Sequence, residues 1–234
     1  MVAVVSEAVA TTLFARTTLA RSVLPHRDPG AEPLSDGAIW RFHLPLAATT
    51  LLTLLALPLT AAALARLPNP TATLAAWPVA YMILLVIRGG GLAYQEITVA
   101  QSRDPRAAAP LRRLALALGL AGSAVVIATV ASPALQLYLR HVVHVPEALD
   151  PLIFAAVTAG GATPLLTVLG AWARGRLMAA GRTGDIYRGM VASLAAQTAA
   201  LAAGLAFRLP PMWVAAGAMT LAGAVEYAYL VRRV

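Results

Sequence analysis

Two opposite charges lie inside a long apolar stretch of this chain. Arg88 and Glu96 are eight residues apart in residues 74–100, where every other side chain is uncharged. In a helix this spacing is a little over two turns, which places both charges on roughly the same face. Glu96 would then bind a coupling cation or a proton while Arg88 meets an anionic substrate. Alternatively the two charges neutralise each other, or Glu96 reaches the polar end of the stretch, and these structural interpretations are favoured.

Three more polar residues interrupt apolar stretches. Gln95 precedes Glu96, while Gln197 and Glu226 lie in two later stretches. Glu226 is within two turns of Arg232, so a structural role at the membrane surface is the favoured interpretation for it. The candidate residues of a substrate or ion pathway are therefore Glu96, Arg88, Gln95, Gln197 and Glu226, and no catalytic residue is predicted.

Glycine and proline mark points where a helix is expected to weaken. The run Gly89-Gly90-Gly91 follows Arg88, and such a run invites a break that frees carbonyl groups to line a cavity. Gly160-Gly161 predicts a kink or a close helix contact, with packing favoured over substrate contact. The residues predicted to break helices are Gly89, Gly90, Gly91, Pro78 and Pro164.

The composition indicates the kind of helix that must position these residues. Of the 234 residues, 59% are hydrophobic and only 12% are charged. A soluble domain has about a quarter of its residues charged, and a disordered chain is poor in apolar residues, so neither class fits. The chain is therefore predicted to be an integral membrane protein.

Six apolar stretches are long enough to cross a bilayer, which takes roughly 20 helical residues. Helices are expected because backbone groups find no water in lipid, and the alternation typical of a membrane barrel is absent. The fold class predicted is an all-α, polytopic transmembrane bundle. The six spans are predicted at Leu44–Leu64, Leu74–Ala100, Leu114–Leu139, Leu152–Ala173, Ile186–Phe207 and Pro211–Val231.

The arginines predict which side each loop faces. All 18 basic residues are arginine, and with six spans fourteen of them fall on one side, three on the other and Arg88 inside a span. Positively charged loops stay in the cytoplasm, so both termini are predicted to be cytoplasmic. This count places Arg174 in a cytoplasmic loop after the fourth span. Arginines at span ends do not form the clustered patch that nucleic acid requires, so nucleic-acid binding is not predicted.

The sequence lacks the residues and motifs needed for disulfides, metal sites and known enzyme active sites. The chain has no cysteine, which excludes disulfides and thiol catalysis. His141 and His144 could ligate a metal, but no third ligand follows at a regular spacing, and no metal site is predicted. Nucleophile, zinc-protease, phosphate-loop and dinucleotide motifs are missing, so neither an enzyme nor a cofactor is predicted.

The N-terminal region differs from the bundle. Residues 1–24 include an apolar segment too short to span, which predicts an interfacial helix or the remnant of a span from a preceding, similar bundle. Both interpretations stay open. Residues 25–39 are a polar linker, and residues 40–234 form the six-helix bundle.

Four segments of the bundle resemble a known transporter group. Residues 40–47 (Trp-Arg-Phe-His-Leu-Pro-Leu-Ala) resemble the entry to the seventh helix of the multidrug/oligosaccharidyl-lipid/polysaccharide flippase superfamily, which includes the MATE transporters. Residues 77–81 (Trp-Pro-Val-Ala-Tyr) and 95–97 (Gln-Glu-Ile) resemble the next helix of its progressive ankylosis branch. Residues 170–178 (Gly-Ala-Trp-Ala-Arg-Gly-Arg-Leu-Met), ahead of Arg182, resemble the loop after the tenth helix.

The resemblance implies one bundle, the C-terminal half, of a two-bundle MATE-like transporter. It implies alternating-access transport or antiport of a small organic or anionic solute, coupled to Na⁺ or H⁺. The use of arginine without lysine indicates a GC-rich bacterial genome, so the membrane is predicted to be a bacterial inner membrane. A second six-helix half, as a homodimer or a separate chain, is the expected partner besides the lipid bilayer. The alternative is a non-transporting membrane subunit or truncated remnant that packs against a partner half.

Overall fold

A computed structural model of the chain describes residues 2–23, 35–102, 106 and 108–234. Their regular secondary structure is helical, and no strand occurs among them. The chain divides into two compact units, Met1–Ile39 and Trp40–Val234. The candidate residues all belong to the second unit.

The first unit contains one apolar helix. Helix α1 spans Val2–Thr18, and η1, a π-helical turn, continues it over Leu19–Val23. With 17 residues, α1 is not among the helices long enough to cross a membrane. Whether it is an interfacial helix or the remnant of a span stays a prediction. Residues 25–34 of the predicted linker lie outside the described residues, and the helix of the first span already begins at Asp36.

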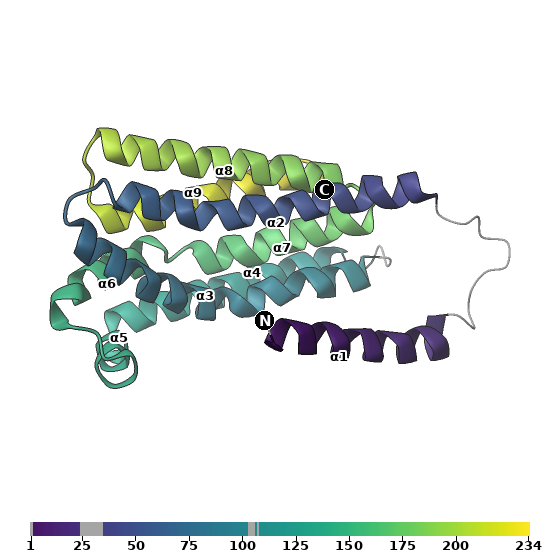
Figure 1. The fold of residues 1–234 in the computed structure, drawn as a ribbon, viewed down its shortest axis with the longest axis horizontal. Helices are drawn as coiled ribbons and strands as arrows, with labels where there is room; N and C mark the ends of the chain where they lie inside the picture. Colours follow the sequence, from purple (N-terminus) through teal and green to yellow (C-terminus); the bar gives the residue numbers. More distant parts are fainter. Residues whose placement is uncertain (1, 24–34, 103–105, 107) are drawn as a thin grey trace. The chain divides into compact units, whose positions relative to one another are not determined.

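The prediction of six membrane-spanning helices is confirmed. Six helices of the described chain are long and apolar enough to cross a bilayer, and they lie side by side in Figure 1. That both termini lie on one side of the membrane, and that this side is the cytoplasm, stays a prediction. The helices are α2 (Asp36–Leu64), α3 (Pro70–Gln101), α4 (Ala108–Ala131), α6 (Asp150–Ala159) with α7 (Thr163–Ala179), α8 (Thr183–Ala206) and α9 (Pro211–Val231).

The third span is shorter than predicted. Helix α4 ends at Ala131 instead of Leu139, and Pro133 stands at the start of the short helix α5 (Ala134–Tyr138). Proline has no amide hydrogen and a fixed φ, so the helix stops before it. The π-helical turn η4 (Leu139–Val143) and the 3₁₀ turn η5 (Glu147–Leu149) then lead into α6.

The predicted irregularity at Gly160-Gly161 is confirmed. The fourth span breaks there into α6 and α7, and Pro164 lies in the first turn of α7, where its missing amide hydrogen costs no helical bond. The position is also a close contact, because a Cβ on Gly160 would lie 2.4 Å from Leu84 Cδ1. Packing and a helix break therefore coincide at this point.

The predicted breaks at Gly89, Gly90, Gly91 and Pro78 are wrong, because α3 is one continuous helix through all four residues. Packing against α7 explains this. A Cβ on Gly91 would lie 2.6 Å from Val168 Cγ2, so the glycine lets the two helices approach closely. Tertiary packing of this kind outweighs the weak helix propensity of glycine.

Helices α3, α7 and α9 form the centre of the bundle, whereas α2 is packed at one end only. The buried residues of α2 are Thr60, Ala63 and Leu64, all in its last two turns. Ala63 and Leu64 join a core that includes Trp77, Ile153 and Met212. The longer part of α2 before Thr60 is exposed or half-buried, and it leaves space between itself and its neighbours.

Candidate functional site: a charged cavity between five helices

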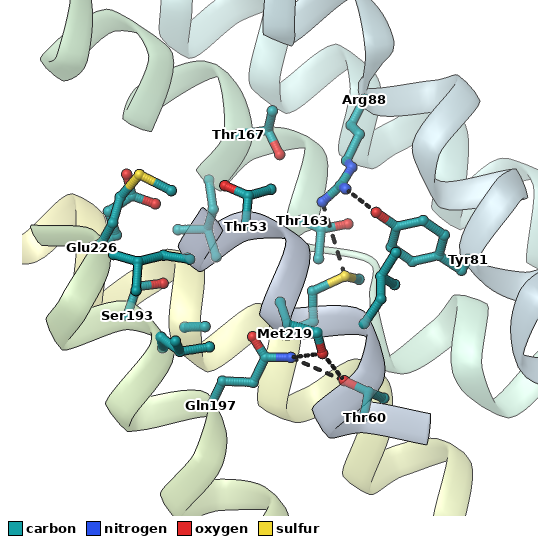
Figure 2. Close-up of a pocket in the computed structure, with 18 of the residues that line it drawn as sticks. Thr53, Thr60, Tyr81, Arg88, Thr163, Thr167, Ser193, Gln197, Met219 and Glu226 are labelled. Atoms are coloured by element: carbon teal, nitrogen blue, oxygen red, sulfur yellow. Dashed lines mark hydrogen bonds between the residues drawn. The ribbon is translucent and has the colours of Figure 1, made fainter. Parts of the chain in front are cut away.

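A cavity of about 220 Å³ lies inside the bundle, and five helices line it. Its wall combines leucine, alanine and methionine side chains with a few polar groups, as small-molecule sites usually do. Figure 2 shows the polar groups facing one another across the space. The polar residues that line the cavity are Thr53 and Thr60 of α2, Tyr81 and Arg88 of α3, Thr163, Thr167 and Arg174 of α7, Ser193 and Gln197 of α8, and Glu226 of α9.

Arg88 carries its charge into this cavity without an acidic partner. Its Nη2 donates a hydrogen bond to the Tyr81 hydroxyl at 3.1 Å, and its Nη1 lies 3.9 Å from the Met219 sulfur. The guanidinium carbon lies 5.4 Å from the centre of the Tyr81 ring. Its Nε is buried and makes no hydrogen bond, and no ion pair among the described residues includes Arg88. The half-buried guanidinium therefore keeps donors and a full charge for a further group.

Gln197 links α8 to α2 at the other side of the cavity. Its Nε2 donates to the Thr60 hydroxyl at 3.0 Å and to the Ala56 carbonyl oxygen at 3.3 Å. The Thr60 hydroxyl in turn donates to the same Ala56 oxygen at 2.9 Å. Gln197 is buried, so these contacts satisfy a polar group that would otherwise be costly in an apolar setting. They position α2 as one wall of the cavity.

Glu226 forms an ion pair with Arg174, not with the C-terminal arginines. The Arg174 Nη1 donates to Glu226 Oε1 at 2.8 Å, and only 18% and 12% of the two side chains are exposed. Arg174 does not lie in a loop, because α7 continues to Ala179 and holds this residue in a helix, while its cytoplasmic side stays a prediction. The carboxylate on α9 neutralises this largely buried charge.

The structure separates Glu96 from Arg88. Glu96 is exposed, lines neither cavity and forms no ion pair among the described residues. Eight residues turn a helix by about 80° beyond two full circles and rise by about 12 Å, so the two groups neither touch nor share a face. The predicted mutual neutralisation of Glu96 and Arg88 is therefore wrong, whereas binding of a coupling cation or a proton by Glu96 stays a prediction.

Gln95 lies where Glu96 was expected. Seven residues turn a helix to within about 20° of its starting direction, so Gln95 is the residue that shares the face of Arg88. It lines a second cavity of about 470 Å³, with His43 and Thr49 of α2 and Met178 of α7. Both cavities are lined by Thr53, Arg174 and Met190. The two spaces therefore adjoin at the Arg174–Glu226 ion pair.

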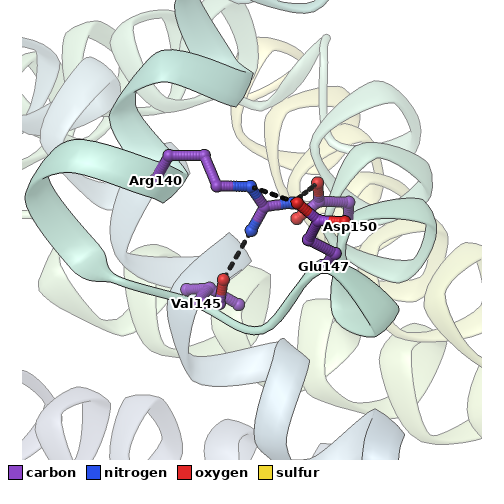
Figure 3. Close-up of polar contacts among 4 residues, drawn as sticks. All are labelled: Arg140, Val145, Glu147 and Asp150. Atoms are coloured by element: carbon purple, nitrogen blue, oxygen red, sulfur yellow. Dashed lines mark hydrogen bonds and ion pairs between the residues drawn. The ribbon is translucent and has the colours of Figure 1, made fainter.

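A second polar cluster lies in the connection between α5 and α6 (Figure 3). Arg140 donates to the Val145 carbonyl oxygen at 2.5 Å, forms an ion pair with Asp150, and has its Nε 3.7 Å from Glu147 Oε1. His141 and His144 lie in the same connection. No group of three or more His, Asp or Glu side chains within the described part of the chain could hold a metal ion.

Sequence reasoning found three of the four charged or amide residues of the first cavity and missed Arg174. Arg88, Gln197 and Glu226 stood out because polar residues are rare in spans. Tyr81, Met219 and the lining threonines gave no signal, because membrane helices use such residues widely. Arg174 was missed because it follows the end of an apolar run. No family model, curated protein or solved structure that was compared with the chain matches it.

Proposed function

We propose that this membrane protein is a transporter or flippase that moves a small organic anion through the cavity at Arg88. The observation that carries the proposal is the charge of this space. Two guanidinium groups and one carboxylate line it, so one positive charge remains without a counter-charge among the described residues. A charge inside a span costs about 2.5–3.5 kcal/mol on insertion scales, and such residues mark substrate pathways.

The surroundings of Arg88 support an organic anion over a bare ion. Tyr81, Trp77 and Leu92 give the cavity aromatic and aliphatic surface beside the guanidinium. A monoanion with an apolar body would neutralise Arg88 and also contact this surface. The second cavity shares Arg174 with the first and extends the space beside it. The MATE-like mechanism, a second six-helix half and cytoplasmic termini belong to the same proposal, on the resemblance and the arginine distribution.

Uptake into liposomes tests the proposal with a permanently charged probe. Radiolabelled benzenesulfonate carries a ring and one negative charge, and it crosses a bare bilayer slowly. We expect liposomes containing the purified full-length chain to accumulate it faster than empty liposomes. R88M removes the charge and keeps an apolar side chain, so uptake should fall by about tenfold or more, because a charge-assisted hydrogen bond contributes about 1.5–3 kcal/mol.

Two controls make the result specific. R66M changes an exposed arginine that contacts only the Ala62 carbonyl oxygen, and uptake should stay unchanged. Benzyltrimethylammonium, a cation of similar size, should not be taken up. Equal uptake by the R88M and unaltered proteins would remove Arg88 from the pathway and contradict the proposal.

A further inference from the structure

Arg174 occupies the boundary between the two cavities. It lines both of them, as do Thr53 on α2 and Met190 on α8. A solute that moves from the second cavity to Arg88 therefore passes the Arg174 guanidinium. At that point the group is not free, because the Glu226 carboxylate already binds it.

The ion pair uses only part of the Arg174 guanidinium. One hydrogen bond, from Nη1 to Glu226 Oε1 at 2.8 Å, is formed with the carboxylate. The Nε of Arg174 is buried and has no hydrogen-bond partner. A guanidinium has five N–H donors and commonly binds a carboxylate through two parallel bonds. The present pair therefore leaves a buried donor that a second acidic oxygen can accept.

Other ion pairs of the bundle are more completely formed. Asp185 lies within ion-pair distance of both Arg182 and Arg188, at 2.6 and 3.7 Å. Arg140 has two carboxylates and a carbonyl oxygen around it. These pairs lie outside both cavities, whereas the singly bonded pair of Arg174 and Glu226 lines the first cavity directly. The least saturated of these pairs is thus the one that a solute reaches.

We infer that Arg174 is a second anion-binding subsite, and that Glu226 holds the place of the solute's acidic group until the solute replaces it. This inference rests on the proposed function. The solute's acidic group accepts from the Arg174 guanidinium, whose Nε is unpaired, and Glu226 is displaced. Exchange of one carboxylate or sulfonate for another keeps the guanidinium neutralised at each stage, so the solute can advance toward Arg88.

Binding of benzenesulfonate to E226Q tests this exchange. Isothermal titration of the full-length chain in detergent measures the dissociation constant. Glu226 competes with the probe in the unaltered protein, and the amide of glutamine does not. We therefore expect E226Q to bind benzenesulfonate about tenfold to a hundredfold more tightly, the range that loss of one charge-assisted competitor gives. The double variant R174M/E226Q should lose this gain.

E147Q is the matched control, because Glu147 pairs with Arg140 in the α5–α6 connection, outside both cavities. Its affinity should equal that of the unaltered protein. If E226Q cannot be purified in folded form, E226D carries the test, because the shorter side chain weakens the pair while keeping its charge. E226D should then bind more tightly by a smaller factor.

The outcomes separate this inference from the proposed function. One outcome is unchanged affinity in E226Q (or in E226D, if E226D is the variant used) together with loss of binding in R88M. This outcome overturns the exchange at Arg174 and leaves Arg88 as the site. Tighter binding in E226Q together with unchanged binding in R88M keeps the Arg174 subsite and contradicts the role of Arg88. Weaker binding in E226Q overturns the inference, since it would make Glu226 a ligand of the probe.

Discussion

Two arginines of this bundle have opposite surroundings. Arg140, in the α5–α6 connection, is 24% exposed and is bonded to Asp150 and Val145, with Glu147 nearby. Arg88, in the middle of α3, has a tyrosine hydroxyl, a tyrosine ring and a methionine sulfur. The Arg140 guanidinium has two carboxylates near it, whereas the Arg88 guanidinium has no counter-charge among the described residues.

The difference indicates what each arginine contributes. A partly buried cation with two carboxylates stabilises the connection in which it lies, and removing it leaves both acids unpaired. A cation with only neutral partners carries a desolvation cost that the fold does not recover. Arg140 therefore has a structural role in the stability of the fold, whereas Arg88 fits the proposed role of binding a ligand.

The largest expected effect comes from exchanging each arginine for methionine. R140M should lower the free energy of unfolding by about 2–3 kcal/mol, somewhat less than for a fully buried pair because Arg140 is partly exposed. R88M should leave it unchanged or raise it by up to about 1 kcal/mol, since no carboxylate loses a partner. Unfolding of the purified variants in mixed micelles, followed by circular dichroism, measures both values.

The control for this pair of variants is R66M, which should change the free energy of unfolding by less than about 0.5 kcal/mol. A destabilisation of R88M as large as that of R140M would break the comparison. It would show that Arg88, too, has a structural role.

A smaller effect on stability is expected from a substitution that changes the packing of α7 on α3 and leaves every charge in place. Gly175 follows Arg174, and a Cβ there would lie 2.7 Å from Thr98 Cβ and 2.8 Å from the Gln95 carbonyl oxygen. G175A should therefore push α7 from α3 and cost about 1–2 kcal/mol of stability, as overpacking usually does. The same unfolding measurement checks this.

G89A supplies the matched control in α3, because a Cβ on Gly89 meets nothing within 4 Å. This variant should be neutral or more stable by up to about 1 kcal/mol, since alanine favours the helix. Equal stability of G175A and G89A would contradict the close packing of α3 on α7.

The smallest effect is expected at Tyr81. Y81F removes the hydroxyl that accepts from Arg88 and keeps the ring beside it. A neutral partner contributes about 0.5–1.5 kcal/mol, so benzenesulfonate affinity should change by less than about tenfold, with stability almost unaltered. Titration calorimetry measures the affinity. An effect as large as that of R88M would assign the binding to Tyr81.

Much of the fold could be predicted, because a membrane span needs a length and an apolarity that are visible in the sequence. The ends of the spans were harder. Pro133 ends α4 through local geometry, while α7 continues past Ala173 because Glu226 on another helix compensates Arg174. A partner 52 residues away leaves no mark in the local pattern.

The site was predictable to the same extent. Arg88, Gln197 and Glu226 are rare residue types for a span, and rarity alone identified them. Glu96 and Gln95 were both candidates, and helix phase places Gln95, not Glu96, at a cavity. The three glycines after Arg88 were read as a break, although the contact of Gly91 with Val168 keeps the helix intact.

Helix α2 is held in the bundle only by its C-terminal end, so its N-terminal part can move most easily. Its buried anchor, Thr60 to Leu64, lies on the far side of Pro58 from the segment that carries Leu52 and Thr53. Moving that segment outward breaks few buried contacts. Pro58 also lacks the amide hydrogen for one helical hydrogen bond, so the helix bends more easily there. Among the five helices around the cavity, α2 therefore offers the least resistance to bending.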